Sequence, residues 1–259
     1  MSFEPTLVFD IETVPDLDGG RRLLGLSTAS DEEVWTAMRA LRHAERGNEF
    51  QPSHLQRIVA ISCVLRAGDN LRVWSLGDLE ADEAELIQRF FDGIERYRPV
   101  LVSWNGSGFD LPVLHYRGLL HGARARAYWD CGGFERDAKW NNYLARYQFR
   151  HTDLMDVLAL YSSRNYAPLT QVAQLLGFPG KLGMDGSKVF DAYREGRLAD
   201  IRAYCETDVL NTWLVYLRFQ MMRGNLDDNG YAREVGIVQD HLRVSEAPHF
   251  AEFLDAWAV

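Results

Sequence analysis

The sequence predicts an α/β protein in which a mixed central β-sheet is flanked by helices. Short apolar runs rich in β-branched residues, which are typical of buried strands, alternate with longer segments whose apolar residues recur at helical spacing. These segments follow one another as strand, two-strand meander, helix, strand, helix, strand and helices. This order indicates one mixed sheet with helices packed against it.

Length and composition are those of an ordinary globular protein. The chain has 259 residues, of which 47% are hydrophobic and 25% charged, enough for one well-buried domain. No stretch approaches the roughly 20 apolar residues that span a bilayer, and the N-terminus lacks a secretory signal. We therefore expect one cytoplasmic domain over residues 1–259, with a core at about 6–222, a helical insertion at about 30–47 and a C-terminal extension at 223–259.

Charge and cysteine content narrow the class of protein further. A net charge of −9 argues against a protein that coats nucleic acid through a broad basic surface, but it is compatible with an enzyme that grips one strand end. Cys63, Cys131 and Cys205 form neither a CxxC pair nor a disulfide framework, so we expect reduced thiols.

The first part of the chain begins with a strand at residues 6–11, which ends at a turn around Pro15 and Asp16. Residues 30–33 carry the S-x-x-E spacing of a capping box, and apolar residues recur at helical spacing behind it, which predicts the helical insertion. Residues 57–65 and 71–75 are expected to form two strands joined by a turn at 68–70.

The second part alternates helices and short strands. An amphipathic helix at 82–97 stops before Pro99, and a buried strand follows at 100–103. A glycine-rich turn then leads into a helix from Asp110 to about residue 120. Residues 151–153 are expected to end another strand, and the chain from 156 onward to be helical, with a long helix at about 198–222.

Two carboxylates stand near the end of the first strand. Asp10 and Glu12 are two residues apart, so both project from one face of the strand, while Phe9 and Ile11 point into the packing on the other. Adjacent carboxylates repel one another unless a hard divalent cation accepts their oxygens. A D-x-E pair alone is weak evidence, because solvated charges are common at strand ends.

Two further motifs carry acidic residues. Asn-Gly-Ser-Gly-Phe-Asp at 105–110 follows a strand, and its Asp110 either caps the next helix or serves a site. Tyr204 and Asp208 lie one turn apart on the same face of the long helix. An aspartate on the apolar-rich side of that helix needs a partner, which a metal ion would provide.

These three motifs occur in an order that resembles the exonuclease motifs of the DEDD superfamily: Phe-Asp-Ile-Glu-Thr at 9–13, Asn-x-x-x-Phe-Asp at 105–110 and Tyr-x-x-x-Asp at 204–208. The tyrosine marks the DEDDy branch. Within it, the chain resembles the stand-alone predicted exonucleases related to the proofreading domain of family B DNA polymerases. The resemblance spans about residues 6–222 and implies an RNase H-like fold.

The resemblance implies a role for each matching residue. Asp10 would bridge two divalent cations, Mg²⁺ or Mn²⁺, with Glu12 and Asp208 completing one site and Asp110 serving the other. Oxygen ligands suit these ions better than Zn²⁺, and two cations about 4 Å apart can activate water and stabilise the leaving 3′ oxygen. Tyr204 would orient the attacking water through a hydrogen bond, since its ordinary pKa of about 10 disfavours a tyrosinate base. The implied substrate contacts are Thr13, Asn105 and Phe109.

Residues 117–150 concentrate positive charge. They hold seven Lys or Arg and three Asp or Glu, a balance of +4, so the rest of the chain carries −13. Aromatic residues are interleaved with these cations, as in proteins that stack and grip a single strand. We expect substrate contacts from this segment, although a helical excursion that packs the rings internally fits equally well; the candidates are Arg124, Arg126, Lys139 and Tyr143.

Two weaker signals stay open. Asp153 is expected to cap the helix that follows it more than to join the metal ligands. The glycine-rich loop from Lys181 to Lys188 matches no phosphate-binding pattern and either contacts the substrate backbone or forms a turn.

The function expected from the sequence is metal-dependent 3′-5′ exonuclease activity on a nucleic acid with a free 3′ end, single-stranded or frayed, with DNA favoured over RNA. Two alternatives remain at this point. A catalytically silent RNase H-like binding module would be expected to have lost a carboxylate, and none is missing. An RNase H-type endonuclease would not account for Tyr204.

Overall fold

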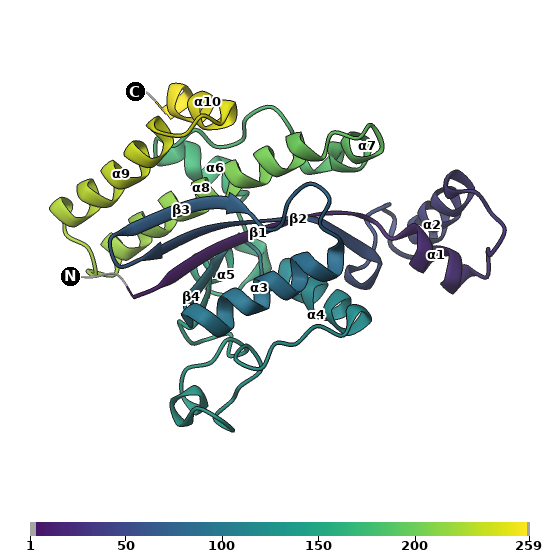
Figure 1. Cartoon of the computed structure of the whole chain (residues 1–259), viewed down its shortest axis with the longest axis horizontal. Coiled ribbons are helices and arrows are strands. Elements are labelled where there is room, and N and C mark those ends of the chain that lie inside the picture. Colours follow the sequence, from purple (N-terminus) through teal and green to yellow (C-terminus); the bar gives the residue numbers. More distant parts are fainter. Residues whose placement is uncertain (1–3, 258–259) are drawn as a thin grey trace.

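The computed structural model describes residues 4–257 and places a five-stranded sheet at the centre of the molecule, in the order β3-β2-β1-β4-β5 (Figure 1). β1 (Thr6–Pro15) pairs antiparallel with β2 (Gln56–Ala67), which pairs antiparallel with β3 (Asn70–Ser75). On its other side β1 pairs parallel with β4 (Val100–Ser103), and β4 pairs parallel with β5 (His151–Asp153). The predicted mixed sheet and its strands are confirmed.

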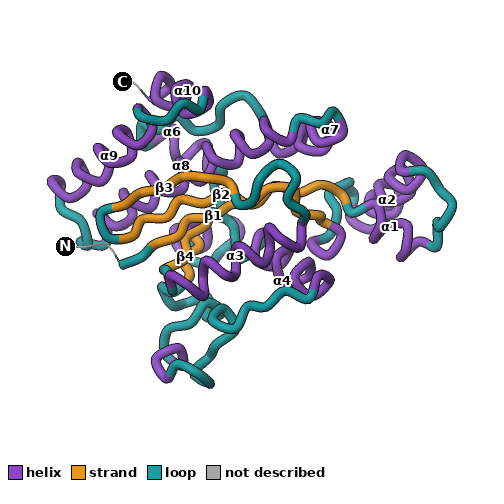
Figure 2. The backbone as a smooth tube through the Cα atoms, viewed as in Figure 1, coloured by secondary structure: helices purple, strands orange, loops and turns teal. Residues whose placement is uncertain are grey.

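Helices cover both faces of this sheet (Figure 2). α3 (Glu83–Tyr97) and α4 (Asp110–His121) lie on one face. The long helix α8 (Leu198–Met222) lies on the other and is packed in turn by three helices: α6 (Leu169–Leu175), α9 (Asp228–Arg243) and α10 (Pro248–Trp257). The helices expected at 82–97, 110–120 and 198–222 are therefore confirmed.

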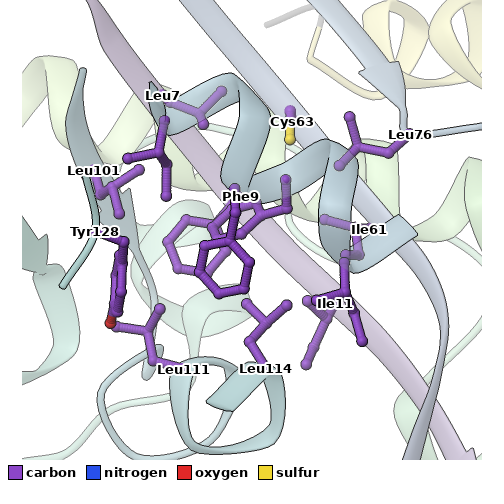
Figure 3. Packing of buried hydrophobic residues seen from close by; sticks show 14 of the residues in the cluster. Leu7, Phe9, Ile11, Ile61, Cys63, Leu76, Leu101, Leu111, Leu114 and Tyr128 are labelled. Carbon is purple, nitrogen blue, oxygen red and sulfur yellow. The ribbon is translucent and has the colours of Figure 1, made fainter. Parts of the chain in front are cut away.

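The alternation of side chains along β1 creates the two layers. Leu7, Phe9 and Ile11 are buried in the cluster shared with α3 and α4, whereas Val8 is buried in the cluster shared with α8. Figure 3 shows Phe9 in the middle of the first cluster, among strand and helix residues such as Leu101, Leu111 and Leu114. Truncating such a ring typically costs about 3–5 kcal/mol, so β1 is firmly held.

The two halves of α8 have different surroundings. From Val209 to Leu217 every residue is buried, and all but Asn211 and Thr212 are apolar, as expected of a helix enclosed by other elements. Asp208, one residue earlier, is only partly buried. Polar groups of the first half can therefore open toward a site. None of the helices within residues 4–257 has the length and apolar character needed to span a membrane.

The part of the chain between β1 and β2 differs from expectation. β1 continues to Pro15, and its pairing with β2 shifts register between Glu12 and Thr13. α1 (Leu17–Leu24) was not among the predicted helices, and it contains two glycines, which disfavour helices; here Gly20 packs so closely on Met38 that a side chain would clash. α2 (Asp31–Arg46) begins at the predicted capping box, which the structure confirms.

Residues 122–150, called the projection below, run from α4 to β5 and extend away from the sheet beneath α3 and α4 (Figure 1). They form loops with a single 3₁₀ turn at Arg136–Lys139, so the helical excursion is not observed. The backbone N–H groups of residues 132–135 all donate to the carboxylate of Asp130, at 2.8–3.1 Å, and fix the shape of the loop.

Candidate active site

β1 presents Asp10 and Glu12 toward α8. Their neighbours Phe9 and Ile11 are buried on the opposite face, against α3 and α4. The Sγ atom of Cys205 on α8 lies 3.6 Å from Oδ2 of Asp10. Single ligand atoms of Asp10, Glu12 and Cys205 lie within 4.8 Å of one another. The orientation predicted from strand alternation is therefore observed.

The first residue of α4 places a third carboxylate beside them. Phe109 is the N-cap residue of α4 and makes no side-chain cap, while Oδ1 of Asp110 accepts a hydrogen bond from the backbone N–H of Ile11 at 3.1 Å. Asp110 is 3% exposed. Its side chain thus reaches across to β1, and it is not the N-cap residue of its own helix.

Asp153 holds the loop that leads to Asp110. Its carboxylate accepts from the backbone N–H groups of Asn105 and Ser107, both at 2.9 Å, and from that of Asp156 in α5 (Leu154–Leu158). It is therefore the cap of α5, as expected. The same bonds fix Asn105, which adopts a left-handed backbone with a φ of 66°, so the loop before Asp110 has a defined path.

α8 contributes the last two motif residues. Tyr204 is 6% exposed, and its hydroxyl lowers the pKa of the Asp208 carboxyl. Asp208 in turn raises the pKa of Tyr204, after burial, and so keeps the phenol protonated. The four carboxylates of Asp10, Glu12, Asp110 and Asp208 are called the carboxylate centre below; the charges of Asp110 and Asp208 raise the pKa values of Asp10 and Glu12.

Burial and mutual repulsion make this centre reluctant to ionise. Burial, followed by the charges of the other carboxylates, holds the pKa values of Asp10 and Glu12 well above their usual range. Burial raises the pKa of Asp110 to about 7 and that of Asp208 to about 6. At neutral pH the centre therefore holds more negative charge than its surroundings favour, which a bound cation would relieve.

Lys181 supplies positive charge beside the centre. Its amine lies 5.3 Å from the centre of the Tyr204 ring, and its charge lowers the pKa values of Glu12 and Asp208. The sequence drew attention to the loop from Lys181 to Lys188 but did not place it. The sequence of this loop could not show how near Lys181 lies to the carboxylate centre, because the path of a loop depends on tertiary contacts.

Phe50 is a second residue that the sequence did not reveal. Its ring is 61% exposed and lies 5.6 Å from that of Phe109, centre to centre. Gln56 anchors this segment at the centre by accepting from the Thr13 hydroxyl and donating to the Gln51 carbonyl, both at 2.9 Å. The pair of rings therefore stands at a fixed place next to Asp110. Thr13, a predicted substrate contact, holds Gln56 through this hydrogen bond.

The predicted contacts in residues 117–150 are not gathered at the carboxylate centre. Arg117 is buried and paired with Asp16 and Glu83. Arg124 and Arg126 are exposed and line a hollow with three residues of α3: Gln88, Asp92 and Glu95. Lys139 lies over the ring of Trp140.

The expectation that Tyr143 offers an open face to a base is wrong. Its ring is 5% exposed and stacks on Tyr128, with the centroids 5.7 Å apart and the planes 12° from parallel. Its hydroxyl donates to the carbonyl of Pro99 at 2.8 Å. Burial of this ring could not be read from a segment in which aromatic and cationic residues simply alternate.

The donor atoms of the centre suit hard divalent cations. Burial raises the pKa of the Cys205 thiol, so it remains an S–H group that donates to Asp10, and the available ligand atoms are carboxylate oxygens. Oxygen ligands favour Mg²⁺ or Mn²⁺ over softer metals. The residues present therefore fit a divalent metal centre built from Asp10, Glu12, Asp110 and Asp208.

Comparison with known families gives one match over most of the chain. The model of the family described as a predicted 3′-5′ exonuclease related to the exonuclease domain of PolB matches residues 48–257. The matched residues include Asp110, Lys181, Tyr204 and Asp208 as well as α9 and α10. The match begins after Asp10 and Glu12.

Individual relatives are large polymerases of which this chain spans a small part. The chain is 27% identical over 145 residues to the catalytic subunit of DNA polymerase epsilon from Saccharomyces cerevisiae and 26% identical to its counterpart from Schizosaccharomyces pombe, which covers 54% of this chain and 6% of each polymerase. The family B DNA polymerase of Pyrobaculum calidifontis aligns with 99% of this chain and 27% of its own, with a TM-score of 0.51 and 16% identity. At this identity the likeness establishes the fold, which is RNase H-like.

Proposed function

Since the chain belongs to the family of predicted 3′-5′ exonucleases related to the exonuclease domain of PolB, we propose that it hydrolyses phosphodiester bonds from the 3′ end of a nucleic acid and depends on divalent cations for this reaction. The ions are two, Mg²⁺ or Mn²⁺, and four residues hold them: Asp10, Glu12, Asp110 and Asp208. The protein works as one domain in which residues 6–222 form the core.

One observation carries the metal assignment. Four carboxylates converge from β1, α4 and α8 in a largely buried place, and burial raises the pKa of Asp110 to about 7 and that of Asp208 to about 6. Lys181 is a cation whose charge lowers the pKa values of Glu12 and Asp208, but one amine does not balance four carboxylates. Divalent cations supply the missing charge and act as Lewis acids toward the attacking water and the leaving 3′ oxygen.

Tyr204 positions the attacking water. Its hydroxyl stays protonated, because burial and the charge of Asp208 raise its pKa, and it can therefore act as a hydrogen-bonding group but not as a base. Lys181, beside the same ring, attracts the scissile phosphate. Replacing Tyr204 by Phe should lower turnover up to about tenfold, because the attacking water loses one hydrogen-bond partner, while Mn²⁺ affinity stays nearly unchanged.

The substrate is a single-stranded or frayed 3′ end, with DNA favoured. The exposed Phe50 ring and its neighbour Phe109 form a surface on which unpaired bases can stack. DNA is favoured because the relatives named above are DNA polymerases. Farther out, Arg124, Arg126 and Lys139 of the projection contact phosphates, and Trp140, which is 74% exposed, takes the stacking role first assigned to Tyr143.

Product analysis of an oligonucleotide labelled at its 5′ end tests this function. We expect a ladder that shortens from the 3′ end in Mg²⁺ or Mn²⁺ and no cleavage in EDTA. Fragments from internal cuts would favour the endonuclease, and an intact oligonucleotide in all conditions would favour a silent binding module. Matched DNA and RNA strands, single and duplex, measure the substrate preference in the same assay.

A further inference from the structure

Three polar residues form a row across the antiparallel strands. Asp10 of β1 pairs with Ser62 of β2, and Ser62 pairs with Ser75 of β3. Residues directly opposite one another project from the same face of a sheet, so the carboxylate and both hydroxyls face α8. The Oγ atoms of Ser62 and Ser75 lie 2.9 Å apart, and both serines are buried. The row is therefore a rigid part of the sheet that begins at Asp10.

The first half of α8 rests on this row through polar contacts. Cys205 lies 3.5 Å from the carbonyl and 3.6 Å from the carboxylate of Asp10. The Ser75 hydroxyl donates to Oε1 of Glu206 at 2.6 Å. Arg202 donates to the carbonyls of Ser75 and Gly77 at 3.2 Å and 2.8 Å. These contacts fix the turns of α8 that carry Tyr204 and Asp208.

The other side of the same turn is held by the C-terminal helix. Oε2 of Glu206 lies 2.8 Å from Nε2 of His249, in the first turn of α10, so this carboxylate joins α10 to the sheet. Phe250 and Phe253 anchor α10 in the cluster around α8, and both are buried. Glu206 stands between Tyr204 and Asp208 in the sequence, so any shift of Glu206 moves both residues.

We propose that His249 is a positioning residue of the active centre, which acts through Glu206 to hold Tyr204 and Asp208 at a fixed distance from Asp10. The helix α10, outside the core expected at 6–222, is then part of the catalytic apparatus. The catalytic role of the α8 turn that carries Tyr204 and Asp208 rests on the proposed function, whereas the contacts that hold this turn do not. The family match supports this role, because it extends to residue 257 and includes α10.

A set of three variants tests the proposal. His249→Ala removes the donor to Glu206 and should weaken Mn²⁺ binding and lower kcat, each about tenfold, the lower end of the range for groups behind metal ligands. The KM for an oligonucleotide should stay unchanged. His249→Gln keeps an N–H donor and should restore most of both losses. Asp255→Asn changes a charge on the same helix at an exposed residue outside this network and is the matched control.

Amide hydrogen exchange gives a readout that does not depend on activity. In His249→Ala the amides of residues 203–208 should exchange faster than in the wild type, while those of α3 should not. Equal Mn²⁺ affinity, kcat and exchange in His249→Ala and the wild type would overturn the proposal. An equal loss in His249→Ala and His249→Gln, with Tm lowered alike, would also overturn it, since that pattern marks a merely structural histidine.

Failure of the proposed function is recognised separately. A wild-type protein without nuclease activity would contradict the exonuclease assignment, while Mn²⁺ affinity and amide exchange in the same variants would still decide whether His249 positions the α8 turn.

Discussion

The carboxylate centre and the projection at residues 122–150 hold their charges in opposite ways. In the centre, Asp10 and Asp208 come from distant parts of the sequence into a largely buried place without an equal number of cations. In the projection, charges that are close in sequence are exposed and partly satisfied by neighbours: Arg126 lies 3.7 Å above the ring of Phe134, and Arg146 pairs with Asp156. Buried carboxylates without enough cations beside them therefore indicate a candidate active site better than a high local density of charged residues does.

The largest effect that follows from this comparison is loss of catalysis in the centre. Asp10→Ala and Asp208→Ala should each lower the rate of 3′ shortening by at least about 100-fold, the upper end of the range for groups that only support metal ligands. Replacement of Arg126 by Gln should change the rate far less. Single-turnover assays in Mn²⁺ measure the rates of all these variants. Similar losses of rate in the carboxylate variants and in the Arg126 variant would contradict the difference drawn between the two regions.

A smaller effect is expected at the Phe50 ring, which belongs to neither region and is proposed to stack on an unpaired base of the substrate. Phe50→Ala should weaken binding of a single-stranded oligonucleotide by about 1–3 kcal/mol if a base stacks on the ring. Phe50→Trp should keep this affinity, because it keeps an aromatic face. Equilibrium binding in Ca²⁺, which is expected to support binding with little cleavage, gives the values. Wild-type affinity in Phe50→Ala would remove the ring from the substrate path.

Metal-free stability should depend on pH through the carboxylate centre. Burial raises the folded-state pKa of Asp208 to about 6, above its value in an unfolded chain, so its contribution to stability is present below about pH 4 and is lost as the pH rises through about 6. Asp208→Asn removes the ionisable group and therefore this loss of stability at high pH. In EDTA the variant should have a higher Tm than the wild type at pH 8, and this difference should shrink as the pH is lowered toward 4.

The direction of this Tm difference shows whether the Asp208 carboxylate destabilises or stabilises the metal-free fold. A lower Tm for Asp208→Asn at pH 8 in EDTA would mean that the carboxylate stabilises the metal-free fold and that the centre is not strained by charge. Addition of Mn²⁺ at pH 8 should reverse the order, because the wild type gains more from the ion. Asp240→Asn, on the exposed surface of α9, is a control that should show neither effect.

The smallest effect is expected in the projection. Replacing Arg124, Arg126 and Lys139 together by Gln should flatten the dependence of single-strand affinity on salt, by a slope of about 0.7 for each phosphate that the protein no longer neutralises, and leave Mn²⁺ affinity unchanged. Tyr143→Ala should mainly lower Tm, since the ring is buried. An unchanged salt dependence in the triple variant would mean that the projection does not touch the strand.

The same contrast explains what the sequence could predict. The long helix at Leu198–Met222 and the strands of the meander were predicted because their apolar patterns are continuous. The four carboxylates were predicted because the three motifs that contain them resemble, in their order, the exonuclease motifs of the DEDD superfamily, while strand and helix geometry placed Asp10 with Glu12, and Tyr204 with Asp208, on common faces. Such local patterns need no knowledge of the tertiary structure.

Features that depend on contacts between distant segments were missed. α1 was not predicted; it contains Gly19 and Gly20, and it forms because Asp16 caps it and Met38 fills the space beside Gly20. Phe50 reaches the centre through Gln51 and Gln56, none of which belongs to a motif. The network from Ser62 to His249 joins four elements, so no single stretch of sequence contains its signal.

Mn²⁺ titration of the metal-free protein, followed by calorimetry at pH 7.5, tests the central claim most directly. We predict that the wild type binds two ions, that Asp10→Ala, which removes one of the four proposed ligands, loses measurable binding, and that the Arg124, Arg126 and Lys139 triple variant binds like the wild type. Absence of Mn²⁺ and Mg²⁺ binding by the wild type, or unchanged binding by Asp10→Ala, would contradict the assignment of the carboxylate centre as the metal site.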